Sequence, residues 1–152
     1  ASSGRHIPIC NRNWCCCIMT CCAYCAAIES AREYLYLENQ FFVSNAGVDG
    51  PGAEVHNQIA HALFRRLSRA IAAKEHFRVI VVVPVHMYGE GNLLDNPSLK
   101  AVVHFQAVSV AKGKDSLLRK LAAAHPHLGC GDLSRYIAFA CLRAHARAPI
   151  LP

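Results

Sequence analysis

The feature that most constrains the fold of this chain is one long run of β-branched residues, Arg78-Val-Ile-Val-Val-Val-Pro-Val85. Valine and isoleucine favour extended backbone, and the run has no polar alternation that would leave one face in water. Such a strand is typical of the interior of a parallel sheet that is covered on both faces. Because parallel strands need long crossover connections, the chain must also supply helices. This run therefore favours an α/β fold.

The rest of the chain supplies the helices and strands that such a sheet needs. Apolar residues recur at helical spacing through Glu54–Ala73, and glycine and proline mark loops on either side of the central strand. The order predicts layered α/β architecture with right-handed crossovers. The other expected elements are a helix over Ala23–Glu33, a strand over Tyr34–Leu37, a helix capped by Ser98 and running towards Val108, a break at Lys112–Lys114, a helix from Asp115 or Ser116, a loop over 125–131, and a strand over Tyr136–Phe139.

The composition indicates a part of a larger assembly. The 152 residues are 53% hydrophobic and 17% charged, which is more apolar than an average soluble domain. We therefore expect some of the surface to be covered by protein that this chain does not contain. The net charge of +6 weakly favours partners that carry phosphate, either nucleic acid or anionic lipid headgroups.

Seven of the nine cysteines lie between Cys10 and Cys25. A disulfide framework spaces its cysteines so that loops can be joined, and adjacent cysteines such as those at 15–17 do this poorly. Cys22 and Cys25 form one C-x-x-C pair, but a structural zinc site needs further ligands at defined spacing. We expect neither a disulfide framework nor a metal site, and the unpaired thiols fit a reducing, intracellular compartment.

Residues 1–22 form a cysteine-rich leader that has two interpretations. Arg5 and Arg12 precede a largely apolar stretch, Trp14–Ile28, which resembles the charged start and apolar core of a signal peptide. This stretch is short for a membrane span. The interpretation that we favour is a buried helix end behind a low-complexity cap, because the second half of the stretch continues into the first expected helix.

Several segments together resemble one known family. Tyr34-Leu-Tyr-Leu-Glu-Asn-Gln-Phe-Phe-Val43 is similar to the Y-I-E-N-Q-F-F signature of eukaryotic phospholipase D. Further blocks resemble that family in the same order and cover about 23–146: the helix before the signature at Ala23–Ala31, the F-R-V-x-V-V-x-P strand at Phe77–Pro84, the H-[WF]-Q-Y segment at Val103–Gln106, the G-x-x-S-[IL]-L segment at Gly113–Leu118, and the Y-I-S-F-x-x-L-R block at Tyr136–Arg143.

The family's two H-x-K-x-x-x-x-D motifs do not occur in this chain. Those motifs supply a histidine nucleophile, a histidine acid and lysines that bind phosphate. None of the nine histidines here has lysine two positions on and aspartate seven positions on. The resemblance places the chain between the two motifs, in the second catalytic half, so we expect it to be inactive alone. It also departs from the family at Ala107, where an aromatic residue is usual, and in the loop His86-Met-Tyr-Gly-Glu-Gly.

The resemblance implies a specific chemistry and a set of supporting residues. In the family, one histidine forms a phosphohistidine, the other protonates the departing headgroup, and water releases phosphatidic acid. Glu38, Asn39 and Gln40 follow a strand end, where α/β folds place ligand contacts. Glu38 would orient a catalytic group, while Asn39 and Gln40 would hydrogen-bond near the phosphate or support the pocket. The alternative, given equal weight, is that the triplet only caps the strand.

The remaining polar candidates carry weaker signals. Arg65, Arg66 and Arg69 are expected on a basic helix face that meets either anionic lipid or solvent. His104 is expected to be an ordinary core or surface histidine. His125 and His127 lack a nearby third metal ligand. No residue pattern indicates a cofactor, and none indicates whether the parent enzyme uses calcium or phosphoinositide.

The sequence therefore predicts part of a phospholipase D, a phosphodiesterase that hydrolyses phosphatidylcholine-type lipids. Its organisation would be a leader (1–22), a partial catalytic domain (23–148) and a tail (149–152). The expected partners are a phospholipid membrane surface and the remaining half of the catalytic domain, with a cytoplasmic, peripheral membrane location. Nucleic acid is not expected, since basic and aromatic residues do not interleave. The alternative is a non-catalytic lipid- or protein-interaction module from a truncated or decayed copy.

Overall fold

The computed structural model describes residues 15–47, 57–84 and 96–142, with the backbone alone for 15–20. Three strands form one parallel sheet in the order β1-β2-β3. These strands are β1 (Tyr34–Glu38), β2 (Arg78–Val82) and β3 (Ile137–Ala140). The β-branched run is thus the interior parallel strand, as predicted.

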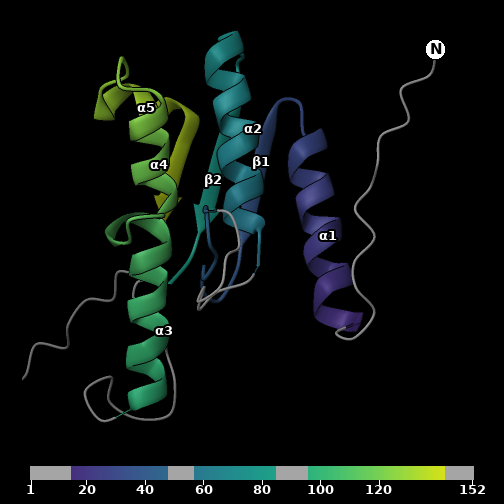
Figure 1. Ribbon diagram of the computed structural model, residues 1–152, viewed down its shortest axis with the longest axis vertical. Helices are drawn as coiled ribbons and strands as arrows, with labels where there is room; N and C mark the ends of the chain where they lie inside the picture. Colours follow the sequence, from purple (N-terminus) through teal and green to yellow (C-terminus); the bar gives the residue numbers. More distant parts are fainter. Residues whose placement is uncertain (1–14, 48–56, 85–95, 143–152) are drawn as a thin grey trace, which may run out of the picture.

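Helices connect the parallel strands and lie together on one side of the sheet. α2 (Ile59–Ala73) joins β1 to β2, and the other connection contains α3 (Pro97–Ala107), the π-helical segment η1 (Val108–Lys112), α4 (Leu117–Ala124) and α5 (Cys130–Tyr136). α1 (Cys15–Ser30) precedes β1 and packs beside α2. Figure 1 shows α1, α2 and α4 side by side in front of the strands, with α3 continuing below α4.

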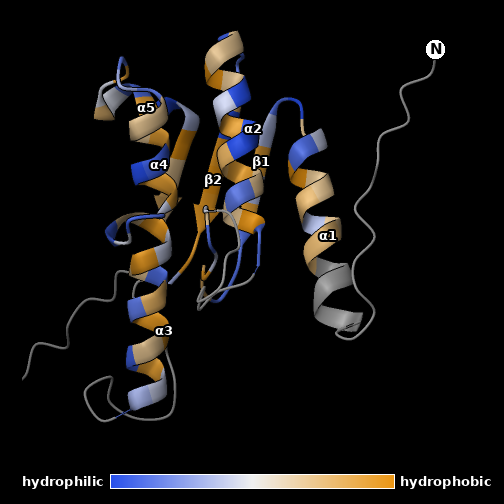
Figure 2. Cartoon of the chain, in the orientation of Figure 1, coloured by the Kyte–Doolittle hydropathy of each residue, from blue (hydrophilic) through white to orange (hydrophobic). Residues whose placement is uncertain are grey.

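The core lies between the sheet and this helical layer. Apolar residues form two rows in register across the strands: Leu35, Val79 and Ile137 in one, and Leu37, Val81 and Phe139 in the other. The helices contribute buried leucines to the same cluster: Leu63 and Leu67 from α2, and Leu117 and Leu121 from α4. The hydrophobic colour of β2 behind the mixed helices is visible in Figure 2.

The opposite face of the sheet has no covering helix among the described residues. Tyr34 and Tyr36 point to that side and are 67% and 52% exposed, and Ile80 beside them is half-buried. The expectation that the central strand is covered on both faces is therefore only partly met in the described part of the chain, since on this side Val82 is buried, Ile80 is half-buried and Arg78 is exposed. The reason is topological, because the helices between the strands all pack on the same layer.

The start of α2 differs from the sequence expectation because its cap comes from elsewhere in the chain. The helix begins at Ile59 rather than at Glu54, and residues 54–56 lie outside the described residues. Gln58 provides no side-chain cap. Instead, the hydroxyl of Ser44 accepts a hydrogen bond from the Ala60 backbone N–H at 2.8 Å. This satisfies one of the N–H groups that a helix start leaves without an intrahelical partner.

Two further boundaries are corrected. Asn96, not Ser98, caps α3: its side chain accepts from the Leu99 N–H at 3.1 Å, and Pro97 takes the first helical position. Part of the expected loop over 125–131, together with the residues that follow it, forms α5, so that the last strand begins at Ile137 rather than Tyr136. The expected break at Lys112–Lys114 and the helix start after Ser116 are both confirmed.

Candidate functional site

The carboxyl ends of the three strands form one edge of the sheet, and a hollow lies at this edge. Its volume is about 420 Å³. It is lined by Glu38, Asn39 and Gln40 after β1, by Val82, Val83 and Pro84 of β2 and its continuation, and by Leu142 after β3. The structure therefore brings the three residues implied by the resemblance to one cavity, at the edge where parallel α/β sheets bind ligands.

Backbone hydrogen bonds hold the strand ends together at this edge. The Asn39 N–H donates to the Val82 carbonyl at 3.2 Å, and the Val83 N–H donates to the Ala140 carbonyl at 3.0 Å. The ladder thus extends just beyond the strands and fixes the backbone from which the polar side chains project. Amide side chains such as Asn39 carry both donors and acceptors, so they can bind phosphate oxygens or a hydroxyl.

The Glu38 carboxylate has one protein partner among the described residues. The Tyr36 hydroxyl donates a hydrogen bond to Glu38 Oε2 at 2.6 Å, and both side chains lie on the sheet face away from the helices. This hydrogen bond to the carboxylate raises the pKa of Tyr36, because loss of the phenol proton would place two negative charges together. Tyr36 consequently stays a donor at neutral pH.

The segment that follows the Glu38–Gln40 triplet is held by hydrogen bonds to residues that the sequence did not single out as site residues. The Phe42 N–H donates to Gln106 Oε1 at 2.9 Å, and the Ser44 N–H donates to the Ser109 hydroxyl at 3.0 Å. Ser109 is buried and donates in turn to the Phe105 carbonyl at 2.7 Å. Gln106 belongs to the H-F-Q segment that supported the family resemblance, so that segment was the available signal.

A second, smaller hollow adjoins the first. Its volume is about 80 Å³, and Asn39 lines both. Its wall is mainly apolar and includes two half-exposed aromatic rings, Tyr24 and Phe41. The ring of Phe42, beside Phe41, is buried and packs edge-on against Phe139 of β3, with ring centroids 5.8 Å apart. Both neighbouring phenylalanines line this hollow, and Phe42 also belongs to the buried core.

The three arginines of the predicted basic face do not share one environment. Arg65 is exposed and forms an ion pair with Glu29 of α1 at 3.2 Å, and Arg69 donates to the Glu29 carbonyl at 2.6 Å. Arg66 is only 2% exposed, so the prediction that it lies on a solvent- or lipid-facing surface is wrong. The cause is the helix geometry, since position 66 follows Leu63 by three residues and precedes Ala70 by four, on the buried side.

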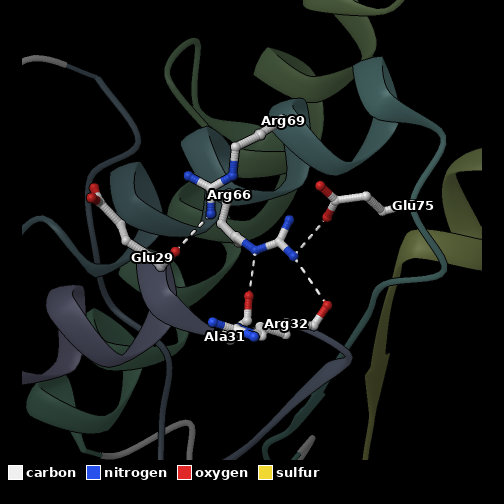
Figure 3. A network of polar contacts seen from close by, with 6 residues as sticks. All are labelled: Glu29, Ala31, Arg32, Arg66, Arg69 and Glu75. Atoms are coloured by element: carbon white, nitrogen blue, oxygen red, sulfur yellow. Dashed lines mark hydrogen bonds and ion pairs between the residues drawn. The ribbon is translucent and has the colours of Figure 1, made fainter.

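Arg66 instead joins the segments that precede β1 and β2. Its Nε donates to the Ala31 carbonyl at 2.8 Å, and its Nη2 donates to the Arg32 carbonyl at 3.2 Å and pairs with Glu75 at 2.8 Å. Figure 3 shows this network. The guanidinium also stacks on Phe77, 3.6 Å from the ring centroid. This cluster lies at the amino ends of the strands, opposite the hollow.

The cysteines and histidines form no second site within the described residues. There, no three side chains of His, Cys, Asp or Glu are grouped so that they could hold a metal ion. Burial, together with Cys21, raises the pKa of Cys25 to about 12, so its thiol stays protonated at neutral pH. Burial and the neighbouring His127 lower the pKa of His125. His104 is exposed and packs edge-on against Phe105.

The described helices include none with the length and hydropathy that a membrane span requires.

The fold and the hollow together define an α/β protein with a hollow at the carboxyl ends of its parallel strands. A family model described as phospholipase D matches residues 19–145. The chain is 36% identical over 124 residues to phospholipase D A of Dictyostelium discoideum, covering 82% of this chain and 9% of that protein. It is 39% identical over 129 residues to phospholipase D of Phytophthora infestans, covering 84% and 7%. It is also 36% identical over 126 residues to phospholipase D1 of Homo sapiens, covering 82% and 11%.

The chain belongs to the phospholipase D family of hydrolases. It spans between 7% and 11% of the length of these curated relatives.

Proposed function

We propose that this chain forms part of the catalytic domain of a phospholipase D that hydrolyses phosphatidylcholine-type lipids to phosphatidic acid and free headgroup. The observation that carries the proposal is the hollow at the carboxyl edge of the sheet, lined by Glu38, Asn39 and Gln40. The resemblance implies that a histidine nitrogen attacks phosphorus and that a second histidine protonates the departing headgroup oxygen. Water then cleaves the phosphorus–nitrogen bond.

The chemistry of the three side chains suggests a division of roles. An ionised carboxylate repels a phosphate, so Glu38 accepts a hydrogen bond from a catalytic donor rather than binding the substrate's phosphorus centre. The amide N–H groups of Asn39 and Gln40 suit the phosphate oxygens or the pocket wall. Glu38 is therefore a group that orients the catalytic machinery, while the amides are candidate substrate contacts.

The H-x-K-x-x-x-x-D motifs must come from outside the printed sequence, because none occurs within it. In this proposal the remaining half of the catalytic domain packs against this chain and contributes them. The sheet face that carries Tyr34 and Tyr36 supports such packing, because no described helix covers it. The two tyrosines and Ile80 leave apolar surface accessible there, beside the charged side chains of Glu38 and Arg78. The chain alone is consequently expected to be inactive.

The same proposal places the enzyme in the cytoplasm at a phospholipid membrane surface. Arg65 and Arg69 are the exposed arginines of α2 and are the candidates for contact with anionic headgroups. Their interactions with Glu29 leave only part of their hydrogen-bonding capacity for lipid. We do not include Arg66 in this surface, because it is buried.

An exchange experiment tests the proposal. The matching 124-residue segment of the Dictyostelium phospholipase D A would be replaced by the corresponding part of this chain, and choline release from phosphatidylcholine vesicles would be measured. We expect hydrolysis by the exchanged enzyme and none by this chain alone. Glu38→Gln should lower turnover, whereas Glu33→Gln, at the opposite end of β1, should not. A folded exchanged enzyme without activity would contradict the proposal.

A further inference from the structure

We infer that Tyr36 is a positioning residue for Glu38: its hydroxyl holds the Glu38 carboxylate in one orientation at the rim of the hollow. This inference rests on the proposed function of the hollow and assigns a role to a residue outside its lining. The carboxylate thereby presents its other oxygen to a catalytic group. Tyr36 acts through Glu38 and does not itself contact substrate.

The strand geometry explains why this pair can form. Side chains two positions apart on a strand project from the same face, so Tyr36 and Glu38 stand beside each other on the side away from the helices. The oxygen–oxygen distance of 2.6 Å is that of a hydrogen bond to an ionised carboxylate. Because the donor binds Oε2, the second carboxylate oxygen Oε1 has no hydrogen-bond donor among the described residues.

The hydrogen bond from Tyr36 restricts the conformational freedom of the exposed Glu38 side chain. Glu38 is exposed, and a glutamate without a partner samples several rotamers, so that fixing it for catalysis costs conformational entropy. Tyr36 has only two rotatable side-chain bonds and extends from a hydrogen-bonded strand, so it is a comparatively rigid donor. A pre-ordered carboxylate can orient a catalytic group without paying this entropy in each turnover.

Tyr136 provides a control that lies away from the hollow and from the packing face. It is the last residue of α5, directly before β3, so it lies at the amino edge of the sheet, and its hydroxyl makes no hydrogen bond to a described residue. Removing the Tyr136 hydroxyl therefore leaves the support of Glu38 unchanged. Tyr36→Phe and Tyr136→Phe remove the same atom and keep the same ring.

The test is a double-mutant cycle in the exchanged enzyme described above. We expect Tyr36→Phe to lower kcat by about 5- to 20-fold with KM changed by less than about 2-fold, since one hydrogen bond to a partly solvated charged group is lost. In the Glu38→Gln background, Tyr36→Phe should cause no further loss, because the two residues act as one unit. Tyr136→Phe should leave kcat unchanged.

The outcomes separate the two hypotheses. A normal kcat for Tyr36→Phe beside a lowered kcat for Glu38→Gln overturns the positioning role and leaves the proposed function standing. Additive losses also overturn the positioning role, because Tyr36 would then act by another route. A normal kcat for Glu38→Gln instead contradicts the proposed role of Glu38.

A second measurement needs no catalysis and no exchanged enzyme. Tyr36 can be titrated by NMR in the 152-residue chain. Because the bond to Glu38 is the first cause of its raised pKa, Glu38→Gln should lower the pKa of Tyr36 towards its ordinary value, and Glu33→Gln should not. The hydrogen bond should persist below the ordinary tyrosine pKa and be lost as the pH rises through the raised value. An unchanged pKa in Glu38→Gln overturns the inference.

Discussion

At the scale of single residues, Arg66 and Glu38 show two ways in which a charge is held in this fold. Arg66 is buried and has carbonyl, carboxylate and aromatic partners from two segments. Glu38 is exposed and has one neutral partner, on its own strand, among the described residues. Burying a charge is costly unless it is paired and hydrogen-bonded, and Nε and Nη2 of Arg66 have such partners, whereas Nη1 has none among the described residues. An exposed carboxylate with an available oxygen suits a site that receives a ligand.

The Arg66 junction makes a stability prediction. Replacing Arg66 with Ala removes the partner of Glu75 and leaves the Ala31 and Arg32 carbonyls without this donor. We expect a loss of about 2 to 4 kcal/mol in the free energy of unfolding, below the full cost for a buried pair because Glu75 is partly exposed. Arg66→Lys should restore little of the lost free energy of unfolding, since an ammonium group cannot reproduce the several directed hydrogen bonds of the planar guanidinium.

Urea unfolding of the 152-residue chain measures this effect. Arg65→Ala is the control, because Arg65 is one position earlier, and its side chain is 60% exposed and pairs only at the surface with Glu29. We expect its cost to stay below about 1 kcal/mol. Equal costs for the two substitutions would mean that the Arg66 contacts do not stabilise the fold.

At the scale of the elements, the sequence predicts what depends on local pattern and misses what depends on distant partners. The apolar stripe of α2 and the β-branched run of β2 identify a helix and a central strand, because periodicity is a local property. The start of α2 could not be located in this way. Its backbone donor at Ala60 is satisfied by Ser44, 16 residues earlier, which belongs to the segment leaving the site.

The same distinction applies to the candidate site. The strand-end position of Glu38 is readable from the sequence, because the signature follows an obvious strand. The contacts of Gln106 and Ser109 with that segment span 64 and 65 residues, and only the folded chain brings them together. Arg66 is a case in which the sequence did hold the information, since helical spacing puts it on the buried side with Leu63 and Ala70.

Gly113 permits the close packing at the end of η1. A Cβ atom at this position would lie 2.7 Å from the Val108 carbonyl oxygen and 2.8 Å from its Cγ1. The Gly113 N–H also donates to that carbonyl at 3.0 Å, so the backbone cannot move away without losing a hydrogen bond. We expect Gly113→Ala to cost about 1 to 3 kcal/mol in the free energy of unfolding.

Gly131→Ala is the matched control for this prediction. Apart from its chain neighbours and the backbone of its own helix, α5, no described atom lies within 4 Å of a Cβ built at Gly131. Because alanine favours helix more than glycine does, this substitution should be neutral or stabilise the fold by up to about 1 kcal/mol. Chemical denaturation of both variants distinguishes the cases. A Gly113→Ala variant as stable as the parent chain would show that η1 tolerates the displacement.

At the scale of the whole molecule, the asymmetry of the sheet is the dominant feature. One face is covered by α1, α2 and α4 (Figure 1). On the other face, in the described part of the chain, Tyr34 and Tyr36 are exposed and Ile80 is half-buried. The relatives are much longer, since this chain spans only 7% to 11% of their length. These facts agree with a chain that forms one part of a larger catalytic domain, as proposed.

The apolar surface that Tyr34, Tyr36 and Ile80 leave on the sheet face makes a prediction for the chain in isolation. Exposed apolar patches of this kind promote association, so the 152-residue chain should self-associate in sedimentation experiments at micromolar concentration. Ile80→Lys places a charge in the middle of this face, on the central strand rather than at an edge, and should shift the chain towards monomer. Ala72→Lys adds the same charge at an exposed position of α2 on the helical side, so it should not. If both lysine variants reduce self-association equally, the net charge of the chain, rather than the sheet face, governs self-association. The proposal that this face docks the remaining half of the domain would then lose that support.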